Sequence, residues 1–428
     1  MPRLPNLGEL PAAADRRAVE TGFPLHLFLF LGARQRWPLH HRAAAEVCVL
    51  RPQAMRHNAH RPIELRTACF SGPRRSRRAA APLAQSVSVL PMNTSPLFTL
   101  TFLGTSAGMP TRERNVSALA VKTVPGPGWL LVDCGEGTQR QLLRTRLRPR
   151  DLAVVCITHA HGDHCYGLPG LLESIGLAGR TEPLTLIAPD AVRQWLQATH
   201  ALTNARLPYE VRFVDADTWQ WQNGPDATLR IERHALLHRV PSHAFRIEVE
   251  QTQVHLDAQA LGAAGLPPGP AWSALRDGQD VLFDGVPGGR LRSADFTCAQ
   301  TQRVCAVIGG DNADPALLRT ACAGAQLLVH EATFTQAVLD KVGPQWMHSS
   351  AQMIAAFAQS VGMPNLILTH LSARHCKPDG LADLRREAAA HYHGGLWIAD
   401  DLDVFTLDAH GKVGKQTPAG DGGAGLAI

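Results

Sequence analysis

The chain has 428 residues and a formal net charge of +5, but the positive charge is confined to its N-terminal part. Residues 1 to 91 contain 14 Arg, no Lys and 5 acidic residues, a net charge of +9 that leaves −4 for residues 92 to 428, so charge says little about the partner of the main part. The 9 cysteines lack CxxC spacing, which argues against a disulfide framework and fits reduced thiols in a cytoplasmic protein. The longest apolar run near the N-terminus, Leu25 to Leu31, is too short to span a bilayer, so no membrane association is expected.

The N-terminal segment, residues 1 to 91, is rich in Ala, Arg and Pro and has no sustained periodicity. It is predicted to be disordered, and three interpretations are open: an organelle transit peptide, a nucleic-acid-binding arm, or sequence upstream of the true start codon. We favour the third, because Met92 lies just before the first clear strand and would begin a self-sufficient protein of 337 residues.

The first predicted elements are strands with alternating apolar residues, over Leu97 to Leu103, Ser117 to Lys122 and Trp129 to Val132. A helix is predicted over Glu136 to Leu147. The loop between the first two strands is rich in Gly, Pro and charged residues, a composition typical of functional loops, and contains Arg112, Glu113, Arg114 and Asn115.

Charged residues follow the third strand. Asp133, at the strand end, is placed to orient a metal-binding imidazole by contacting the ring nitrogen that does not bind the metal. In the predicted helix and its tail, Arg140 and Arg144 share one face and Arg148 follows. This basic rim could hold phosphates, although an ordinary solvated helix face explains it equally well.

Four metal-type ligands stand within six residues after the next buried strand, Asp151 to Ile157. They are His159, His161, Asp163 and His164, and a helix is predicted to begin at Gly167. Imidazole and carboxylate ligands suit Zn²⁺, with Mn²⁺ or Fe²⁺ as alternatives. One ion cannot easily use all four, so the pattern indicates a two-metal site with further ligands from elsewhere. Cys165, beside the cluster, is interpreted as a small buried residue.

The second half of the chain continues the alternation of strands and helices. The segment Arg233 to His243 is predicted to be a His-rich turn, and Gln251 to Gly289 a turn-rich excursion from the main body. Four strands in the whole chain end in a polar ligand, which is how an α/β protein gathers a site at one edge of its sheets. The remaining predicted elements are strands at 184–187, 209–215, 229–232, 245–249, 304–308, 327–329 and 365–368, and helices at 191–202 and 351–361.

These motifs together resemble the metallo-β-lactamase superfamily and, within it, the ribonuclease Z family of transfer-RNA 3′-processing endonucleases. The HxHxDH motif indicates only the superfamily. The narrower resemblance depends on PTRERN (Pro110 to Asn115), DCGEGTQ (Asp133 to Gln139), LPPGP (Leu266 to Pro270), HEATF (His330 to Phe334), HSSA (His348 to Ala351) and THLSAR (Thr369 to Arg374). It covers Phe98 to Leu407 and implies an α/β fold, the metallo-β-lactamase-like αββα four-layer sandwich, with an inserted flexible arm.

The resemblance also implies the ligands of two Zn²⁺ ions per subunit. The first ion would be held by His159, His161 and His238, the second by Asp163, His164 and His370, and Asp311 would bridge them. His238 is chosen over His234 and His243 because of its spacing from Phe245 and Arg246. The two other histidines are expected to be structural or exposed.

The implied reaction is zinc-dependent hydrolysis of precursor transfer RNA, leaving a 3′-hydroxyl on the transfer RNA and a 5′-phosphate on the trailer. Asp163 would accept the proton of the attacking water, His348 would act as general acid, and Glu331 would orient His348. His330 is expected to be structural. Asn312 and Ala244 depart from the usual Thr and Gly of the family without removing a ligand.

The family's arm grips transfer RNA, often across a homodimer, and residues 251 to 289 correspond to it, although they contain no Lys and only one Arg, Arg276. Two other functions are compatible with parts of the pattern. A phosphodiesterase acting on small phosphodiesters could use the same scaffold but would not need the LPPGP arm. A non-catalytic RNA-binding relative would be expected to have lost ligands, and all seven are present.

Overall fold

The structure is a computed structural model, and it describes residues 95–126, 128–222, 229–375 and 377–416. The expectations for the N-terminal segment, residues 1 to 91, therefore lie outside the described residues. Among the residues described, no helix is both long enough and apolar enough to cross a membrane.

The first sheet has eight strands in the order β17-β16-β1-β2-β3-β4-β5-β6. Strands β3 to β6 are parallel to one another, and the remaining neighbours are antiparallel. Strand β4 is buried almost throughout, as expected of a strand covered on both faces. The bounds are β1 (Pro96–Gly104), β2 (Ala118–Thr123), β3 (Trp129–Val132), β4 (Leu152–Cys156), β5 (Leu184–Ala188), β6 (Val211–Asp215), β16 (Val404–Asp408) and β17 (Val413–Gln416).

The second sheet has seven strands in the order β15-β14-β13-β12-β9-β8-β7. Strands β12 to β15 are parallel, so their carboxyl ends meet at one edge, whereas β7, β8, β9 and β12 are joined by antiparallel pairing. The bounds are β7 (Gln220–Gln222), β8 (Leu229–Leu236), β9 (Ser242–Leu256), β12 (Thr297–Gly309), β13 (Leu327–Glu331), β14 (Asn365–Thr369) and β15 (Gly395–Ile398).

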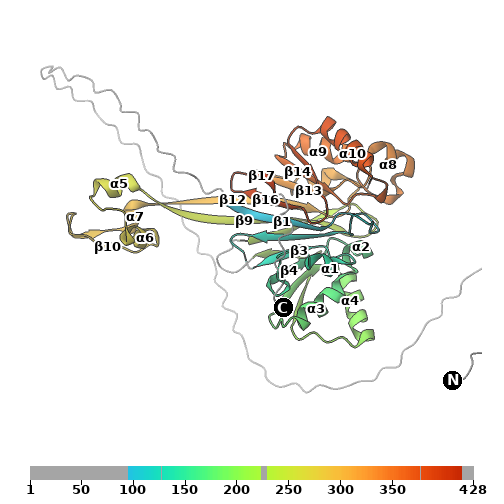
Figure 1. Ribbon diagram of the computed structural model, residues 1–428, viewed down its shortest axis with the longest axis horizontal. Coiled ribbons are helices and arrows are strands. Elements are labelled where there is room, and N and C mark those ends of the chain that lie inside the picture. The colour runs from blue at the N-terminus through green and yellow to red at the C-terminus, as the bar shows by residue number, and fades with distance from the viewer. Residues whose placement is uncertain (1–94, 127, 223–228, 376, 417–428) are drawn as a thin grey trace, which may run out of the picture. The chain divides into compact units, whose positions relative to one another are not determined.

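The two sheets pack face to face, with helices outside each (Figure 1). Phe98, Phe245 and Phe405 lie in the apolar layer between the sheets. A second layer lies under the helices of the first sheet and a third under those of the second. The α/β sandwich of four layers predicted from the resemblance is therefore confirmed. The helices are α1 (Thr138–Leu142), α2 (Gly162–Cys165), α3 (Leu168–Leu177) and α4 (Asp190–Thr203) on one side, and α8 (Gln336–Val342), α9 (Ala351–Ser360) and α10 (Pro378–His391) on the other.

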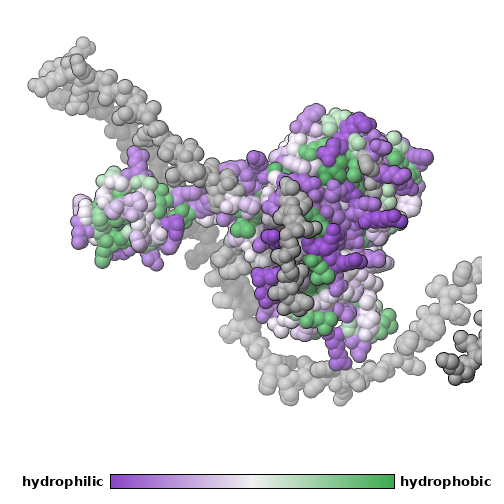
Figure 2. Space-filling view, in the orientation of Figure 1, coloured by the Kyte–Doolittle hydropathy of each residue, from purple (hydrophilic) through white to green (hydrophobic). Residues whose placement is uncertain are grey.

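Strands β9 and β12 continue beyond the sandwich as a two-stranded ribbon (Figure 1). Buried side chains end at Val249 on β9 and at its partner Val304 on β12, and none is buried from there to Leu256 and Thr297. The ribbon carries a small unit with its own apolar cluster around Leu261. Figure 2 shows hydrophobic residues on the surface of this unit. The unit contains α5 (Ala258–Ala263), α6 (Pro270–Arg276), β10 (Val281–Leu282), β11 (Arg290–Leu291) and α7 (Ser293–Phe296).

Two predicted elements are shorter in the structure, and several elements of the structure, among them α2, α8, α10 and β16, were not predicted. The helix predicted over Glu136 to Leu147 is only Thr138–Leu142, because Gly137 has a left-handed conformation and the Thr145 hydroxyl binds the Leu142 carbonyl where the helix ends. The His-rich turn is shorter than predicted, because β8 extends through His234 to Leu236 and β9 begins at Ser242. An unpredicted helix, α2, contains Asp163 and His164.

Candidate metal centre

The predicted ligands lie together where strand ends from both sheets meet. His159 and His161 follow β4 of the first sheet, and Asp163 and His164 lie in α2. The others come from the second sheet: His238 from the turn between β8 and β9, Asp311 after β12, and His370 after β14. The structure therefore brings all seven predicted ligands to one place, although they span more than two hundred positions of the sequence.

The first group of ligand atoms surrounds His161. Its Nδ1 atom lies 3.0 Å from Nε2 of His159 and 3.1 Å from Nε2 of His238. The Oδ2 atom of Asp311 lies 3.6 Å from the same nitrogen of His159 and of His238. Three imidazole nitrogens and a carboxylate oxygen thus converge on one point, an arrangement that suits Zn²⁺.

The second group lies on the other side of Asp311. The Nε2 atoms of His164 and His370 are 3.2 Å apart, and Asp163 Oδ2 is 3.4 Å from the first and 3.3 Å from the second. Asp311 Oδ1 lies 3.5 Å from His164 and 3.3 Å from His370. The two oxygens of Asp311 therefore face different groups, which is the position of a bridging ligand.

The second nitrogens of these imidazoles are held by hydrogen-bonding groups. Asp133 Oδ2 lies 2.7 Å from His164 Nδ1, and the same carboxylate accepts hydrogen bonds from the backbone N–H and the hydroxyl of Thr158. The Met347 carbonyl lies 2.8 Å from His238 Nδ1, and the Thr333 hydroxyl lies 3.0 Å from His370 Nδ1. Such contacts fix ring orientation as in metal sites, and they confirm that Asp133 orients an imidazole.

Burial and neighbouring charges set the protonation of the ligands. Burial lowers the pKa of His159, His161 and His238, so these imidazoles are neutral at pH 7. Burial opposes ionisation of Asp163, but His164 and His370 outweigh it and lower the pKa of this carboxyl. Burial opposes protonation of His164, but the carboxylates of Asp311, Asp133 and Asp163 outweigh it and raise the pKa of this imidazole. The donor set still fits a pair of divalent ions, because metal binding displaces the proton of a ligand imidazole.

His348 and Glu331 form a pair beside the ligands. His348 Nδ1 lies 3.0 Å and 3.2 Å from the two carboxylate oxygens of Glu331, and 3.7 Å from Asp311 Oδ2. Burial alone would lower the pKa of His348, but the carboxylates of Glu331, Asp311 and Asp163 raise it to about 9. At pH 7 the imidazole therefore carries a proton that it can donate.

Other candidate residues lie apart from the ligand atoms. His234 and His243 belong to neither group, and His243 instead lies 3.3 Å from Asp217. His330 is fully buried, with its Nδ1 2.8 Å from the Glu331 carbonyl. Cys165 is buried and its pKa is raised by burial to about 12, which excludes a thiolate nucleophile at neutral pH and agrees with its interpretation as a packing residue.

A cavity of about 440 Å³ opens onto the centre. The backbone N–H of Gly108, from the loop after β1, donates a 2.7 Å hydrogen bond to Asp163 Oδ2 at its wall. Sequence reasoning missed Gly108, because a backbone amide leaves no signal in residue types. The residues that line this cavity are Gly108, Pro110, Val116, Glu136, His161, Gly162, Asp163, Tyr166, Arg239, Asp311, His348 and His370.

Comparisons with known proteins agree with this architecture. Residues 111–245 match the metallo-beta-lactamase superfamily. A ribonuclease Z of Marinobacter nauticus is 46% identical over 314 residues, which are 72% of this chain and 96% of that protein. A ribonuclease Z of Pseudomonas putida is 44% identical over 324 residues, 74% of this chain and 99% of that protein.

More distant relatives retain the same extent of similarity. A ribonuclease BN of Escherichia coli is 35% identical over 310 residues, 72% of this chain and 99% of that protein. Among solved structures, the metallo-beta-lactamase fold protein YhfI of Bacillus subtilis superimposes with a TM-score of 0.50 at 21% identity, covering 72% of this chain and 99% of that one. This last likeness supports the fold alone.

Proposed function

This chain belongs to the ribonuclease Z family of the metallo-β-lactamase superfamily, and we propose from that premise that it removes the 3′ trailer of precursor transfer RNA by metal-dependent hydrolysis. The proposal depends on one observation: seven side chains that can bind metal converge in this chain, which aligns with 96% of the length of a ribonuclease Z. The proposed products are a transfer RNA with a 3′-hydroxyl and a trailer with a 5′-phosphate.

The centre is proposed to hold two Zn²⁺ ions, with Mn²⁺ or Fe²⁺ as alternatives. Three histidines would hold one ion, Asp163, His164 and His370 the other, and Asp311 both. When bound, such a pair of ions lowers the pKa of a water molecule and neutralises charge on the phosphate that this water attacks. The ligands of the first ion would be His159, His161 and His238.

The chain's own residues would move the protons. Asp163 would take the proton of the attacking water, since its ionised carboxylate lines the cavity and the Gly108 amide holds one oxygen in place. His348 would give its proton to the leaving 3′-oxygen of the transfer RNA. Glu331 would keep His348 oriented and charged, because it contacts Nδ1 and leaves Nε2 as the donor.

The unit at the end of the β9–β12 ribbon is proposed to grip the substrate away from the cut, across a homodimer. Its arginines are partly neutralised, since Arg276 contacts Asp277 at 3.3 Å and Arg290 contacts Asp280 at 2.7 Å. The grip would therefore depend on shape and hydrogen bonds more than on charge. We also propose a cytoplasmic location, which fits the free thiols of Cys134, Cys156, Cys165, Cys298, Cys305 and Cys322.

The test is to incubate the purified chain with a 3′-extended transfer RNA, with and without chelator, and to map the cut. A single metal-dependent cut at the mature 3′ end is expected. Asp163→Ala should reduce the rate by roughly 10²–10⁴-fold, the usual contribution of a positioned acid or base. Hydrolysis of small phosphodiesters without any cleavage of the RNA would contradict the proposed substrate.

A further inference from the structure

The three arginines of the predicted basic rim lie in different surroundings. The Arg144 guanidinium donates a 2.8 Å hydrogen bond to Gln141. Arg148 contacts Asp151 at 2.9 Å and lines a cavity with Trp129, at the edge of the sheet where β3 and β4 begin. Among the residues described, the side chain of Arg140 has neither a hydrogen-bond nor an ion-pair partner, and it lines a different cavity. Arg140 and Arg148 therefore line different cavities.

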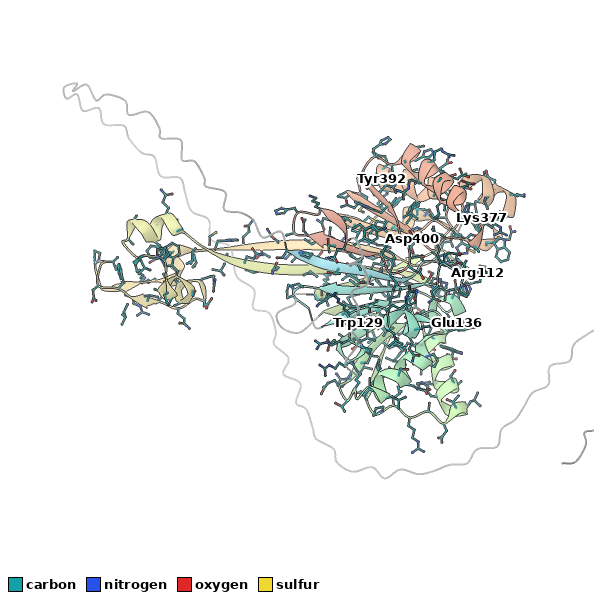
Figure 3. All side chains as sticks on the ribbon, in the orientation of Figure 1. Arg112, Trp129, Glu136, Lys377, Tyr392 and Asp400 are labelled. Carbon is teal, nitrogen blue, oxygen red and sulfur yellow. The ribbon has the colours of Figure 1, made fainter. Side chains whose placement is uncertain are left out.

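The cavity at Arg140 adjoins the catalytic one. Its volume is about 270 Å³, and Glu136 and Tyr166 line both cavities, so these two side chains form the wall between them. Figure 3 shows that Glu136 lies well away from Trp129, and hence from the cavity of Arg148. Pockets for drug-sized ligands usually begin at about 300 Å³, so this slightly smaller space suits a small occupant such as a single base and its sugar.

Tyr166 presents an aromatic ring on this shared wall. The residue is 62% exposed, although it follows directly on α2 and the buried His164 and Cys165. Its ring lies so close to Gly162 that a side chain there would come within 2.4 Å of it, and it is tilted by 30° against Trp195 at a centroid distance of 5.6 Å. The ring is therefore supported from within the protein and open on its outer side, which is the arrangement of a stacking surface for an unpaired base.

The polarity of the proposed cut decides which nucleotide passes Tyr166. His348 comes from the loop before α9, in the half of the molecule that contains the second sheet, and would protonate the 3′-oxygen of the transfer RNA. The transfer-RNA side of the cut therefore lies toward His348. The trailer continues from the same phosphate toward the opposite wall, which consists of Tyr166, directly after α2, and Glu136, just before α1.

We propose that the cavity between Tyr166 and Arg140 binds the first nucleotide of the trailer, with its base stacked on Tyr166 and the following phosphate near Arg140. This inference rests on the proposed function and assigns a site for the product that leaves. The formal charges of Arg140 and Glu136 cancel within the cavity, so stacking supplies most of the affinity and charge supplies less.

The test combines base removal in the substrate with substitution of Tyr166. One precursor has an abasic site at the first trailer nucleotide, and a matched precursor has it at the third. The first abasic site is expected to reduce kcat/KM of the wild-type chain by about tenfold, the usual worth of one stacked base, and the third to have little effect. Tyr166→Ala should reduce kcat/KM on the intact precursor by about tenfold, and the first abasic site should then cause no further reduction. Tyr166→Phe should behave as wild type.

Arg140→Gln is compared with Arg148→Gln, which removes an equal charge from the distant cavity. Only Arg140→Gln should raise KM by a fewfold and flatten its salt dependence. The inference is overturned if the wild-type chain ignores the first abasic site, or if Tyr166→Ala remains as sensitive to it as wild type. Failure of the wild-type chain to cleave any precursor would instead overturn the proposed function, so the two failures are distinguishable.

Discussion

The predicted metal-binding histidines are oriented by residues that are not themselves predicted ligands. His164 is oriented by Asp133, whose carboxylate also fixes the Thr158 backbone one residue before His159. Asp133 has a φ of 60°, a left-handed conformation that Asn also tolerates. A single carboxylate therefore determines the position of ligands in both groups.

Asp133→Asn is expected to weaken metal binding by about 10–100-fold, the usual effect of removing such a supporting group, while the fold is retained. The amide preserves the backbone conformation but removes the charge that faces His164. Competition with a chromogenic chelator measures the affinity. Asp151→Asn, at the opposite edge of the sheet, is the control and should bind metal as wild type does; equal affinity of the two variants would contradict the assignment.

The pH dependence of cleavage should report on His348. Its pKa is about 9, so the protonated donor is present at neutral pH and is lost as the pH rises through this value. Glu331→Gln removes a carboxylate that raises this pKa, and the alkaline limb of kcat/KM should therefore move to lower pH. A profile of kcat/KM between pH 6 and about 10 tests this. An alkaline limb that does not move would show that His348 is not the proton donor.

At the scale of elements, continuous apolar runs were predictable as strands and polar segments were not. The segments around Val154 and Val307 are continuous apolar runs, and both are strands as predicted. The outer halves of β9 and β12 were missed because Thr252 and Thr301, which face each other across the ribbon, lie far from any core and give no apolar alternation. Cross-strand pairing, which a single sequence does not display, holds these segments together.

Removing the unit carried by the ribbon should separate substrate grip from chemistry. Leu256 and Thr297 are paired, so residues 257–296 can be replaced by Asn-Gly, which favours a two-residue hairpin turn. Cleavage of precursor transfer RNA should fall to background, whereas hydrolysis of bis(p-nitrophenyl) phosphate should persist, because the unit has its own apolar cluster and contributes no ligand. Unchanged RNA cleavage would contradict a gripping role.

At the scale of the molecule, the centre joins the two halves of the sandwich. Its ligands could be predicted from the sequence because each follows a strand end or lies in a recognisable motif, and parallel strands bring such ends to one edge. The role of Gly108 and the wall formed by Tyr166 could not, since both depend on contacts between segments that lie far apart in the sequence. Residue identity specified the chemistry, and tertiary contacts specified its surroundings.

Removal of metal is therefore expected to destabilise the whole molecule. Each ion that binds only the folded chain contributes about 2.7 kcal/mol at a hundredfold excess over Kd, and its loss leaves the buried carboxylate of Asp311 with only the neighbouring imidazoles as partners. Chelator should lower Tm by several degrees, and Zn²⁺ should restore it, as thermal unfolding can measure. Asp311→Asn should show little response to chelator. Identical Tm values of the wild-type chain with and without chelator would contradict a joining role.

The paired strands β9 and β12 set the distance between the candidate metal centre and the unit that they carry. Their thirteen residue pairs run from Ala244 opposite Gly309 to Leu256 opposite Thr297, and twelve steps of about 3.4 Å give a length of roughly 40 Å, of which the ribbon is the outer part. Two residues added to each strand would extend this length by about 7 Å and keep every side chain on its face, whereas one residue added to one strand would make a bulge and turn the tip. With the proposed gripping role, changes in the distance between the grip and the cut should therefore come in even, matched increments.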